Sequence, residues 1–439
     1  MSGIADRPIS LGNVLPRALA RVRALRQGFE TRRLKDKLAF PSDMERWRND
    51  APPAGERPVQ SQVRIGQPVV DVYGFMRGSL GLGQAARLYV RALALTGMPM
   101  RIFDVSLRDG GLRWETAEQD VACGVHVAGR RFNLVFVNPD HFHELSPVLS
   151  FQEGQVRPYT IAVWFWELPT IPERWLEALA HVDEVWVASS FVRTAFSRSG
   201  DKPVVLVPLP VAPVDSGRAG RDRASIGVGE DAYVFLFVFD FNSVYARKNP
   251  GAIIEAFEAA FPRGDENARL IIKTSNGLDH RDDLRDLMRR AESDSRVMVR
   301  DQRLGSTQMA VLHASSDAYV SLHRSEGFGL TIAESMARGK PVIATNWSGN
   351  VDFMDAENSL PIDYELVPVA EGQYPGDVRE RWAEPDVAHA ARAMRRLVRD
   401  RQLGDRLGAR ARSRLESDYN FERVGKLMAD RLATLATSP

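Results

Sequence analysis

The sequence predicts an α/β protein made of two doubly wound domains, each with a parallel β-sheet covered by helices on both faces. From about residue 66 onward, short apolar runs alternate with segments of helical periodicity, a pattern typical of such sheets. The alternation breaks once, at Pro208-Leu209-Pro210-Val211-Ala212-Pro213 and a polar stretch that ends at Asp231, and then resumes. This break between two similar halves indicates a hinge between domains.

Length and composition agree with two domains and exclude several classes of protein. A chain of 439 residues with 44% hydrophobic side chains is too long for one ordinary core. The formal net charge of +1 gives no signature of nucleic-acid binding. Cys123 is the only cysteine, which excludes an intramolecular disulfide and a Cys-based metal cluster. No apolar run approaches the ~20 residues that span a bilayer. We expect a cytoplasmic protein, soluble or at most peripheral at the inner face of the membrane.

The strand candidates lie in chain order on either side of the hinge. Those of the first half are residues 69–75, 100–105, 132–137, 160–165, 184–188 and 204–207. Those of the second half are residues 233–239, 270–273, 297–300, 318–322 and 342–344. Because ligands of doubly wound sheets bind beyond the carboxyl ends of the strands, we expect the functional site in the cleft between the halves.

Residues 11–40 are predicted to form a basic amphipathic helix. They hold eight Arg and Lys side chains against only Glu30 and Asp36, and apolar residues recur at helical spacing from Leu15 to Phe29. One interpretation is docking on an anionic membrane surface. The other is a helix packed on a domain edge with its charged face in solvent. Ala51-Pro52-Pro53-Ala54-Gly55 then breaks the helix and is typical of a linker.

The strongest local signal is the segment Ser325-Glu326-Gly327-Phe328-Gly329-Leu330-Thr331-Ile332-Ala333-Glu334, which follows a predicted strand and opens a helix. Its two glycines allow the backbone to approach a ligand closely, and free amides at a helix start favour a diphosphate. Glu326 lies in the loop, where a carboxylate can accept hydrogen bonds from sugar hydroxyls. Glu334, two turns later, can reach a ribose diol. The segment therefore predicts a site for a nucleotide sugar.

In its strand, loop and helix context, this segment resembles the Glu-x7-Glu signature of the retaining glycosyltransferases of family 4, which share the GT-B fold of two facing Rossmann-like domains. The resemblance covers most of residues 66–437. It implies that Glu326 contacts the donor sugar, that Glu334 contacts the nucleotide ribose, and that backbone amides bind the diphosphate. The amides concerned are those of Phe328, Gly329 and Leu330.

The resemblance also implies a division of the chain. Residues 1–65 are then an N-terminal extension and linker, and residues 66–210 are an N-terminal Rossmann-like domain on the acceptor side. Residues 211–418 are a C-terminal Rossmann-like domain that binds the donor. Residues 419–439 are a last helix that crosses back onto the first domain.

The family places a Lys, and usually an Arg five or six residues before it, on the loop after the first strand of the second domain, where they neutralise the leaving diphosphate. In this chain the Lys is Lys248. The usual Arg position holds Asn242 or Ser243, so Arg247 is the candidate for the second cation. The alternative is a solvated pair that caps the following helix.

A second glycine-rich segment, Gly81-x-Gly83-x-x-Ala86, follows the first predicted strand. It fits a dinucleotide fingerprint, and Asp104 closes the next strand where a ribose-binding acid would lie. An NAD site is therefore an alternative, although the turn between strand and glycines is longer than that fingerprint allows. The family resemblance implies instead that Gly81 and Gly83 approach the diphosphate and the acceptor.

Metal-dependent glycosyltransferases hold a divalent cation with an Asp-x-Asp motif at a strand end. No such motif follows a predicted strand in this sequence. We therefore expect no metal and no cofactor, with a nucleoside diphosphate sugar as the donor substrate.

The chain departs from the family at a position near the reacting sugar. Many members carry a His at the end of a first-domain strand, and this position falls here on Trp166 or Glu167. Glu167 is the candidate catalytic carboxylate, with helix capping as its alternative role. His141 and His143 are further candidates from a neighbouring loop, with surface or capping roles as the alternative. Trp347, after a second-domain strand, could stack on a sugar or base, or simply cover the sheet edge.

The expected function is transfer of a sugar from a nucleoside diphosphate donor to a hydroxyl of a glycan or lipid-linked acceptor, with retention at the anomeric carbon. Synthesis of a polysaccharide, glycan or glycolipid fits this chemistry. Three alternatives remain: an NAD-dependent oxidoreductase, a catalytically silent GT-B binding protein, and a GT-B sugar-nucleotide epimerase.

Overall fold

The computed structural model describes residues 31, 34, 35, 37–41, 44, 68–77, 81–108, 111–116, 130–145, 149, 157–198, 200–212, 220–264, 266–375 and 379–437. Most of the predicted basic helix, Cys123, the glycine-loop residues 78–80 and the hinge residues 213–219 lie outside this part of the chain. Membrane docking through residues 11–40 therefore stays a prediction. Among the described helices, none combines the length and apolar character needed to cross a bilayer.

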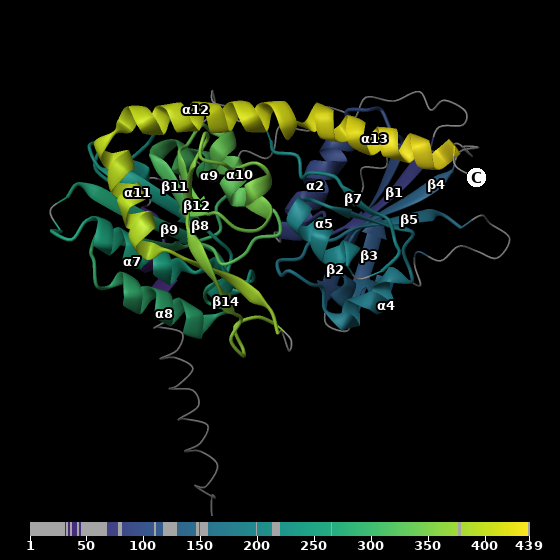
Figure 1. The fold of residues 1–439 in the computed structure, drawn as a ribbon, viewed down its shortest axis with the longest axis horizontal. Helices are drawn as coiled ribbons and strands as arrows, with labels where there is room; N and C mark the ends of the chain where they lie inside the picture. The colour runs from purple at the N-terminus through teal and green to yellow at the C-terminus, as the bar shows by residue number, and fades with distance from the viewer. Residues whose placement is uncertain are drawn as a thin grey trace, which may run out of the picture.

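The first domain is built on a seven-stranded sheet with the strand order β3-β2-β1-β4-β5-β6-β7 (Figure 1). Neighbouring strands are parallel except β2 and β3, which are antiparallel. The strands are β1 (Val69–Gly74), β2 (Met100–Arg108), β3 (Gly111–Thr116), β4 (Arg131–Phe136), β5 (Tyr159–Val163), β6 (Glu184–Val187) and β7 (Val204–Leu206). The helices are α2 (Gly81–Ala94), α3 (Phe142–Leu145), α4 (Leu176–Leu179) and α5 (Ser190–Ser197). Every residue of β1 is buried, as expected for a strand in the middle of a covered sheet.

The second domain is built on a six-stranded parallel sheet with the order β10-β9-β8-β11-β12-β13. The strands are β8 (Tyr233–Val238), β9 (Ala268–Thr274), β10 (Val297–Asp301), β11 (Ala318–Ser321), β12 (Val342–Thr345) and β13 (Leu360–Ile362). The helices are α6 (Tyr245–Lys248), α7 (Pro250–Ala260), α8 (Arg281–Ala291), α9 (Ser306–Ser315), α10 (Leu330–Ala337) and α11 (Val387–Arg399). Strands β14 (Tyr364–Pro368) and β15 (Arg381–Pro385) form a separate antiparallel hairpin.

The predicted architecture of two doubly wound domains is confirmed, and each predicted strand is present with ends that shift slightly. The sequence pattern did not predict β3, β13 or the β14–β15 hairpin. Of these elements, the β14–β15 hairpin is the one that contacts the loop of Glu326, through the Ala383 amide and the Arg324 carbonyl oxygen.

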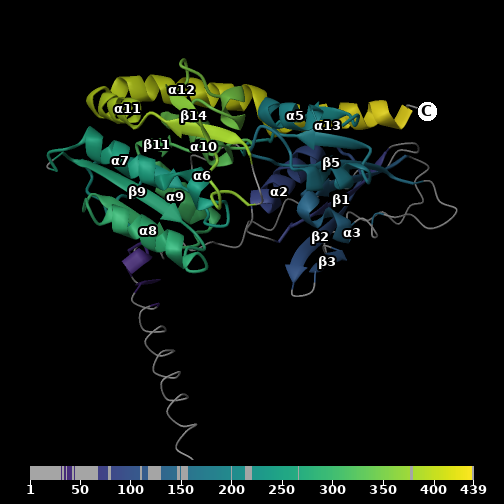
Figure 2. The same ribbon diagram turned by 60° about the horizontal axis from the view of Figure 1, so that its bottom comes forward.

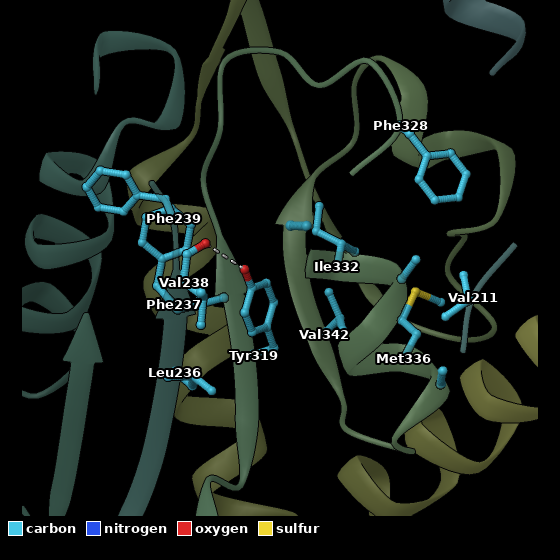
Figure 3. Packing of buried hydrophobic residues seen from close by; sticks show 14 of the residues in the cluster. Val211, Leu236, Phe237, Val238, Phe239, Tyr319, Phe328, Ile332, Met336 and Val342 are labelled. Carbon is cyan, nitrogen blue, oxygen red and sulfur yellow. Dashed lines mark hydrogen bonds between the residues drawn. The ribbon is translucent and has the colours of Figure 1, made fainter. Parts of the chain in front are cut away.

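The core beside the second sheet fixes the start of α10 (Figure 3). Tyr319 of β11 is 1% exposed, and its hydroxyl donates to the carbonyl oxygen of Val238 at 3.3 Å. Ile332 and Met336 of α10 are buried in the same apolar cluster as Tyr319. This packing holds the first turn of α10, and the loop that precedes it, at the carboxyl ends of β11 and β12.

Two helices at the end of the chain connect the domains, α12 (Arg401–Asp418) and α13 (Phe421–Thr437), which run in line along one side of both (Figures 1 and 2). In α12, Gly408 lies so close to the carbonyl group of Gly339 that a Cβ would overlap it. In α13, Gly425 has the same relation to the carbonyl of Ala92 in α2. The last helix therefore packs on the first domain, as predicted.

The described residues of the N-terminal extension contact the second domain. Leu38, Phe40 and Met44 are buried. The Phe40 amide donates to Oε1 of Gln302 at 3.1 Å, and the Nε2 of Gln308 donates to the Met44 carbonyl at 3.3 Å. The chain therefore contacts the second domain before it enters the first sheet at β1.

Candidate active site

Glu326 lies in the loop between β11 and α10 and is 9% exposed. Its amide donates to Oγ of Ser348 at 2.8 Å, and its carbonyl oxygen accepts from the amide of Gly349 at 2.9 Å. Ser348 has a φ of 76°, which is uncommon for a residue other than glycine and is a strain often found at functional sites. At Gly349 a Cβ would overlap the backbone of Gly327. The loops after β11 and β12 thus fit closely together and fix the backbone of Glu326.

Two cations from α6 contact the Glu326 carboxylate. The Lys248 ammonium donates to Oε1, and the Arg247 guanidinium lies 3.1 Å from Oε2. The short helix α6 that carries both is flanked by Val244 and Asn249, whose φ values of 46° and 50° are positive. A β-branched residue with positive φ is a true backbone outlier, so the surrounding structure must hold this loop firmly.

The charged side chains of Lys248, Arg247 and Glu326 are buried, and a single carboxylate contacts both cations. The side chains of Lys248, Arg247 and Glu326 are 12%, 5% and 11% exposed. Burial raises the pKa of the Glu326 carboxyl, but the Lys248 and Arg247 cations outweigh burial and hold this pKa at about 2. Glu326 is therefore ionised throughout the physiological range, and one carboxylate serves two cations.

The Arg247 guanidinium has further partners that hold it in place. It donates to the Ser325 carbonyl oxygen at 2.8 Å, and it lies 3.5 Å from Oε1 of Glu167 in the first domain. Asn242, at the position where the family usually carries Arg, instead contacts His280 at 2.9 Å. Arg247 thus contacts the same carboxylate as Lys248, and its expected role at a diphosphate stays a prediction.

Glu167 follows β5 and faces the second domain. Its Oε2 accepts from the hydroxyl of Tyr374 at 2.6 Å, and its carbonyl oxygen accepts from the hydroxyl of Ser325. The neighbouring Trp166 is 5% exposed, and its indole nitrogen donates to the carbonyl oxygen of Thr170 at 2.6 Å. Of the two residues that the resemblance aligns with the family's His, Glu167 is the one whose carboxylate lies near Arg247, at 3.5 Å.

The domains meet directly at the loop of Glu326. A Cβ on Gly327 would lie 2.8 Å from the carbonyl oxygen of Trp166, so only glycine allows this approach. The Ser189 hydroxyl of the first domain donates to the Gly327 carbonyl oxygen at 2.6 Å, and the Ser190 amide donates to Asp352 Oδ2 at 2.6 Å. The structure is thus a closed arrangement of the two domains around this loop.

The start of α10 offers unpaired hydrogen-bond donors. Gly329, with a φ of 90°, is the residue before the helix, and within the described chain the amides of Phe328, Gly329 and Leu330 donate to no protein acceptor. Glu334 lies one turn further, is partly buried, and its carboxylate accepts no hydrogen bond from a described residue. Burial raises the pKa of this carboxyl, with Arg338 opposing the shift. Unpaired backbone amides therefore lie at the start of α10, and the unpaired, partly buried Glu334 carboxylate lies one turn along the same helix.

Other candidates from the sequence are not brought to Glu326 by any described contact. Gly81 and Gly83 lie in the first turn of α2. Asp104 accepts a hydrogen bond from the Arg77 amide at 3.0 Å. His141 is paired with Glu144 at 3.2 Å within its own short helical segment, and the exposed His143 lies on the same segment.

The aromatic candidate Trp347 lies between the two domains. Its ring centroid is 5.7 Å from that of Phe191 in α5 and 5.3 Å from that of Tyr364 in β14. Its buried Nε1 has no partner among the described residues. Trp347 directly precedes Ser348, whose hydroxyl accepts a hydrogen bond from the Glu326 amide. The loop that carries Trp347 therefore lies beside Glu326.

The sequence pattern did not identify His323, which lies three residues before Glu326. It is fully buried, and burial lowers the pKa of its imidazole, so the ring is neutral. Nδ1 lies 3.1 Å from Oγ of Ser321, and Nε2 lies 3.0 Å from Oδ1 of Asn350. Because the Asn350 amide nitrogen donates to Thr345, its oxygen must accept, which assigns the ring proton to Nε2. His323 thereby ties β11 to the loop after β12.

Metal-ligating side chains do not gather at this site. In the part of the chain that the structure describes, no group of three or more His, Cys, Asp or Glu side chains has an arrangement that could hold a metal ion. The positive charge next to Glu326 comes from Lys248 and Arg247 instead.

Comparison with protein families gives a match in the second domain. Residues 220–359 match the family described as glycosyl transferases group 1. This range includes both α6 and the segment from Glu326 to Glu334. None of the curated protein sequences compared with this chain matches it.

Comparison with solved structures gives similar proteins over most of the chain. Sucrose-phosphate synthase from Thermosynechococcus elongatus is 17% identical, with a TM-score of 0.60 over 84% of this chain and 99% of that chain. Anabaena HepE in complex with UDP and glucose is 13% identical, with a TM-score of 0.59 over 84% and 100% of the two chains. The OtsA apo structure is 12% identical, with a TM-score of 0.59 over 83% of this chain and 99% of that chain. At these identities the likeness shows the fold, which is GT-B.

Proposed function

We propose that this glycosyltransferase, which carries a glycosyl transferases group 1 domain on a GT-B fold, transfers a sugar from a nucleoside diphosphate donor to an acceptor hydroxyl. The transfer proceeds with retention at the anomeric carbon. In this proposal residues 211–418 bind the donor, and residues 66–210 bind a glycan or lipid-linked acceptor. Residues 419–439 complete the first domain. The NAD-dependent oxidoreductase alternative has no support from the family match.

One observation carries the site assignment: two buried cations contact the Glu326 carboxylate, and unpaired backbone amides follow it at the start of α10. A diphosphate needs this combination, because charge grows on it as the glycosidic bond breaks. In this structure Glu326 contacts both cations, and Glu167 lies 3.5 Å from Arg247. A bound diphosphate would take over Lys248, which leaves Glu326 to accept hydrogen bonds from sugar hydroxyls.

The closed contact between the domains fits the same chemistry. Trp166 and Glu167 cover the Glu326 loop from the acceptor side, with the Ser325 hydroxyl bound to the Glu167 carbonyl. Such cover excludes water from the reacting carbon and limits hydrolysis of the donor. We assign Glu167 to the acceptor face of the reacting sugar, where the family usually carries His.

Replacement of Glu334 tests the nucleotide site. Glu334→Ala is expected to weaken the binding of nucleoside diphosphates by about 1 to 3 kcal/mol, because a buried ribose diol loses its acceptor. Isothermal titration with UDP, GDP and ADP measures this change. Glu334→Gln, which keeps one acceptor and the side-chain volume, should retain part of the affinity. Equal affinity of the wild-type protein and Glu334→Ala for every nucleotide would remove Glu334 from the site.

Chelation tests the source of positive charge. Because Lys248 and Arg247 are already in place to neutralise the diphosphate, EDTA is expected to leave the rate of sugar transfer unchanged. The measurement is the initial rate with and without EDTA, followed by addition of Mn²⁺. A rate that vanishes with chelator and returns with Mn²⁺ would contradict this assignment.

The two remaining alternatives, an epimerase and a silent binding protein, differ from a transferase in the reaction that they catalyse. A sugar-nucleotide epimerase would convert the donor without an acceptor, and a silent GT-B protein would bind a nucleotide with no turnover. A thermal-shift panel of UDP, GDP, ADP and NAD identifies the base. The donor-only reaction then separates an epimerase from a transferase, and the reaction with an acceptor separates a transferase from a silent protein.

A further inference from the structure

The β14–β15 hairpin of the second domain reaches toward the first domain (Figure 1). Its strands pair from Tyr364 with Pro385 to Pro368 with Arg381, and its connecting segment contains Val369 and Tyr374. Val369, Tyr374 and Trp382 are buried in the apolar cluster that also contains Trp164 and Trp166 of the first domain. An element of the donor domain is thus packed into the core of the acceptor domain.

The connecting segment makes specific polar contacts with the loop after β5. The Tyr374 side chain is 7% exposed, its ring meets that of Trp166 edge-on at 5.5 Å, and its hydroxyl donates to Oε2 of Glu167 at 2.6 Å. A few residues later, Glu380 accepts a hydrogen bond from the Thr170 hydroxyl. Burial raises the pKa of the Tyr374 hydroxyl well above its usual value, with the Glu167 charge adding to the shift, so the hydroxyl stays a donor at any working pH.

The base of the hairpin contacts the other side of the same site. The Ala383 amide donates to the Arg324 carbonyl oxygen at 3.0 Å, two residues before Glu326. The Arg324 guanidinium lies over the ring of Trp382 at 5.2 Å and donates to Oε2 of Glu384 at 2.7 Å. The hairpin therefore holds the donor loop through β15 and the acceptor-side carboxylate through Tyr374.

These contacts form a continuous chain of polar side chains across the site. Tyr374 donates to one oxygen of Glu167, the other oxygen lies 3.5 Å from Arg247, and Arg247 lies 3.1 Å from Glu326. A carboxylate with one oxygen fixed by a hydroxyl cannot rotate away from its cation without losing a charge-assisted hydrogen bond. The orientation of Glu167 thus depends on the hairpin and not only on Arg247.

We propose that Tyr374 is a positioning residue for sugar transfer: its hydroxyl holds the Glu167 carboxylate against Arg247, and through this contact the hairpin clamps the acceptor side of the closed site. The proposal rests on the proposed function, because it assigns Glu167 to the acceptor face of the reacting sugar. Tyr374 itself acts through Glu167 and contacts no substrate.

Tyr374→Phe tests the proposal because it keeps the ring against Trp166 and removes only the hydroxyl. We expect kcat to fall about 10-fold, as for the loss of one hydrogen bond to a charged group, while the KM for the donor changes less than about twofold. Tyr364→Phe is the matched control. Tyr364 belongs to the same hairpin, its hydroxyl has no hydrogen-bond partner in the described chain, and its loss should leave kcat unchanged.

A double-mutant cycle separates positioning from a general loss of packing. Glu167→Gln and Tyr374→Phe should each lower kcat, and the double variant should be no slower than Glu167→Gln alone, because the hydroxyl acts only through the carboxylate. Additive losses, or an equal effect of Tyr364→Phe, would overturn the proposal.

Amide hydrogen exchange gives a readout that needs no sugar transfer. The Val369 amide, bonded to the Glu380 carbonyl at 2.8 Å, and the Ala383 amide should exchange faster in Tyr374→Phe than in the wild type or Tyr364→Phe. A wild-type protein that transfers no sugar would count against the proposed function. Exchange that is equal in all three proteins would count against the clamp.

Discussion

Lys248→Met is expected to lower kcat for sugar transfer by about 10²- to 10³-fold, on the order of the loss of one preorganised donor to a developing anion. Lys248 makes its only described side-chain hydrogen bond to Glu326, so its ammonium can shift to a diphosphate that binds beside it. The charge it stabilises grows in the transition state, and the affinity for the intact donor should therefore fall much less than kcat. Methionine keeps the aliphatic stem, and Glu326 remains paired with Arg247. Steady-state kinetics with saturating acceptor measure both quantities.

Lys340→Met is the matched control for Lys248→Met. Lys340 is also a partly buried lysine of the second domain, but it donates to the carbonyl oxygens of Ala314 and Ser316, away from Glu326. Its loss should lower stability without changing kcat per folded molecule. Near-normal kcat for Lys248→Met together with an inactive Arg247→Met would assign the neutralising role to Arg247.

The strands that the sequence predicts most directly are those buried along their whole length. Strand β8 is buried along its whole length and reads as one apolar run, so its pattern alone identifies it. Strand β14 is partly or fully exposed at every position, because its hairpin has a main sheet on neither side. Its sequence therefore shows no apolar run, and only its pairing with β15 makes it a strand.

For the candidate site, too, the sequence predicts residues that lie close together in the chain, but not contacts between residues far apart in it. Glu326 and Glu334 share one loop and helix, so their spacing in this context predicts them, and the family resemblance implies Lys248 on the loop after a strand. The contact from Tyr374 to Glu167 joins positions 207 apart, and no local pattern records it. His323 is three residues before Glu326, but a buried histidine that ties two loops looks like any other core residue in a sequence.

Glu326→Ala is expected to destabilise the fold by about 3 to 5 kcal/mol, the cost of leaving buried charges without their partner. Arg247 keeps Glu167 as a counterion at 3.5 Å, but Lys248 has no other described anion in contact. Because the pKa of Glu326 is about 2, below its ordinary value of 4.5, its contribution is fully present above about pH 4.5 and is lost as the pH falls toward 2. The variant should lack this acid-dependent component of stability. Urea unfolding at pH 7 and pH 3 measures it.

The same substitution should make the protein unusually responsive to its ligand. In the wild type a diphosphate must displace Glu326 from Lys248, whereas in Glu326→Ala the two cations stand without it and a diphosphate restores a counterion. We therefore expect a nucleoside diphosphate to raise the melting temperature more for Glu326→Ala than for the wild type, although transfer falls by about 10- to 10²-fold through the lost hydrogen bonds to the sugar. Glu326→Gln, which keeps an oxygen toward Lys248, should lie between the two in both measurements. An equal thermal shift in all three proteins would mean that Glu326 and the diphosphate do not share these cations, and the donor would then have to bind away from α6.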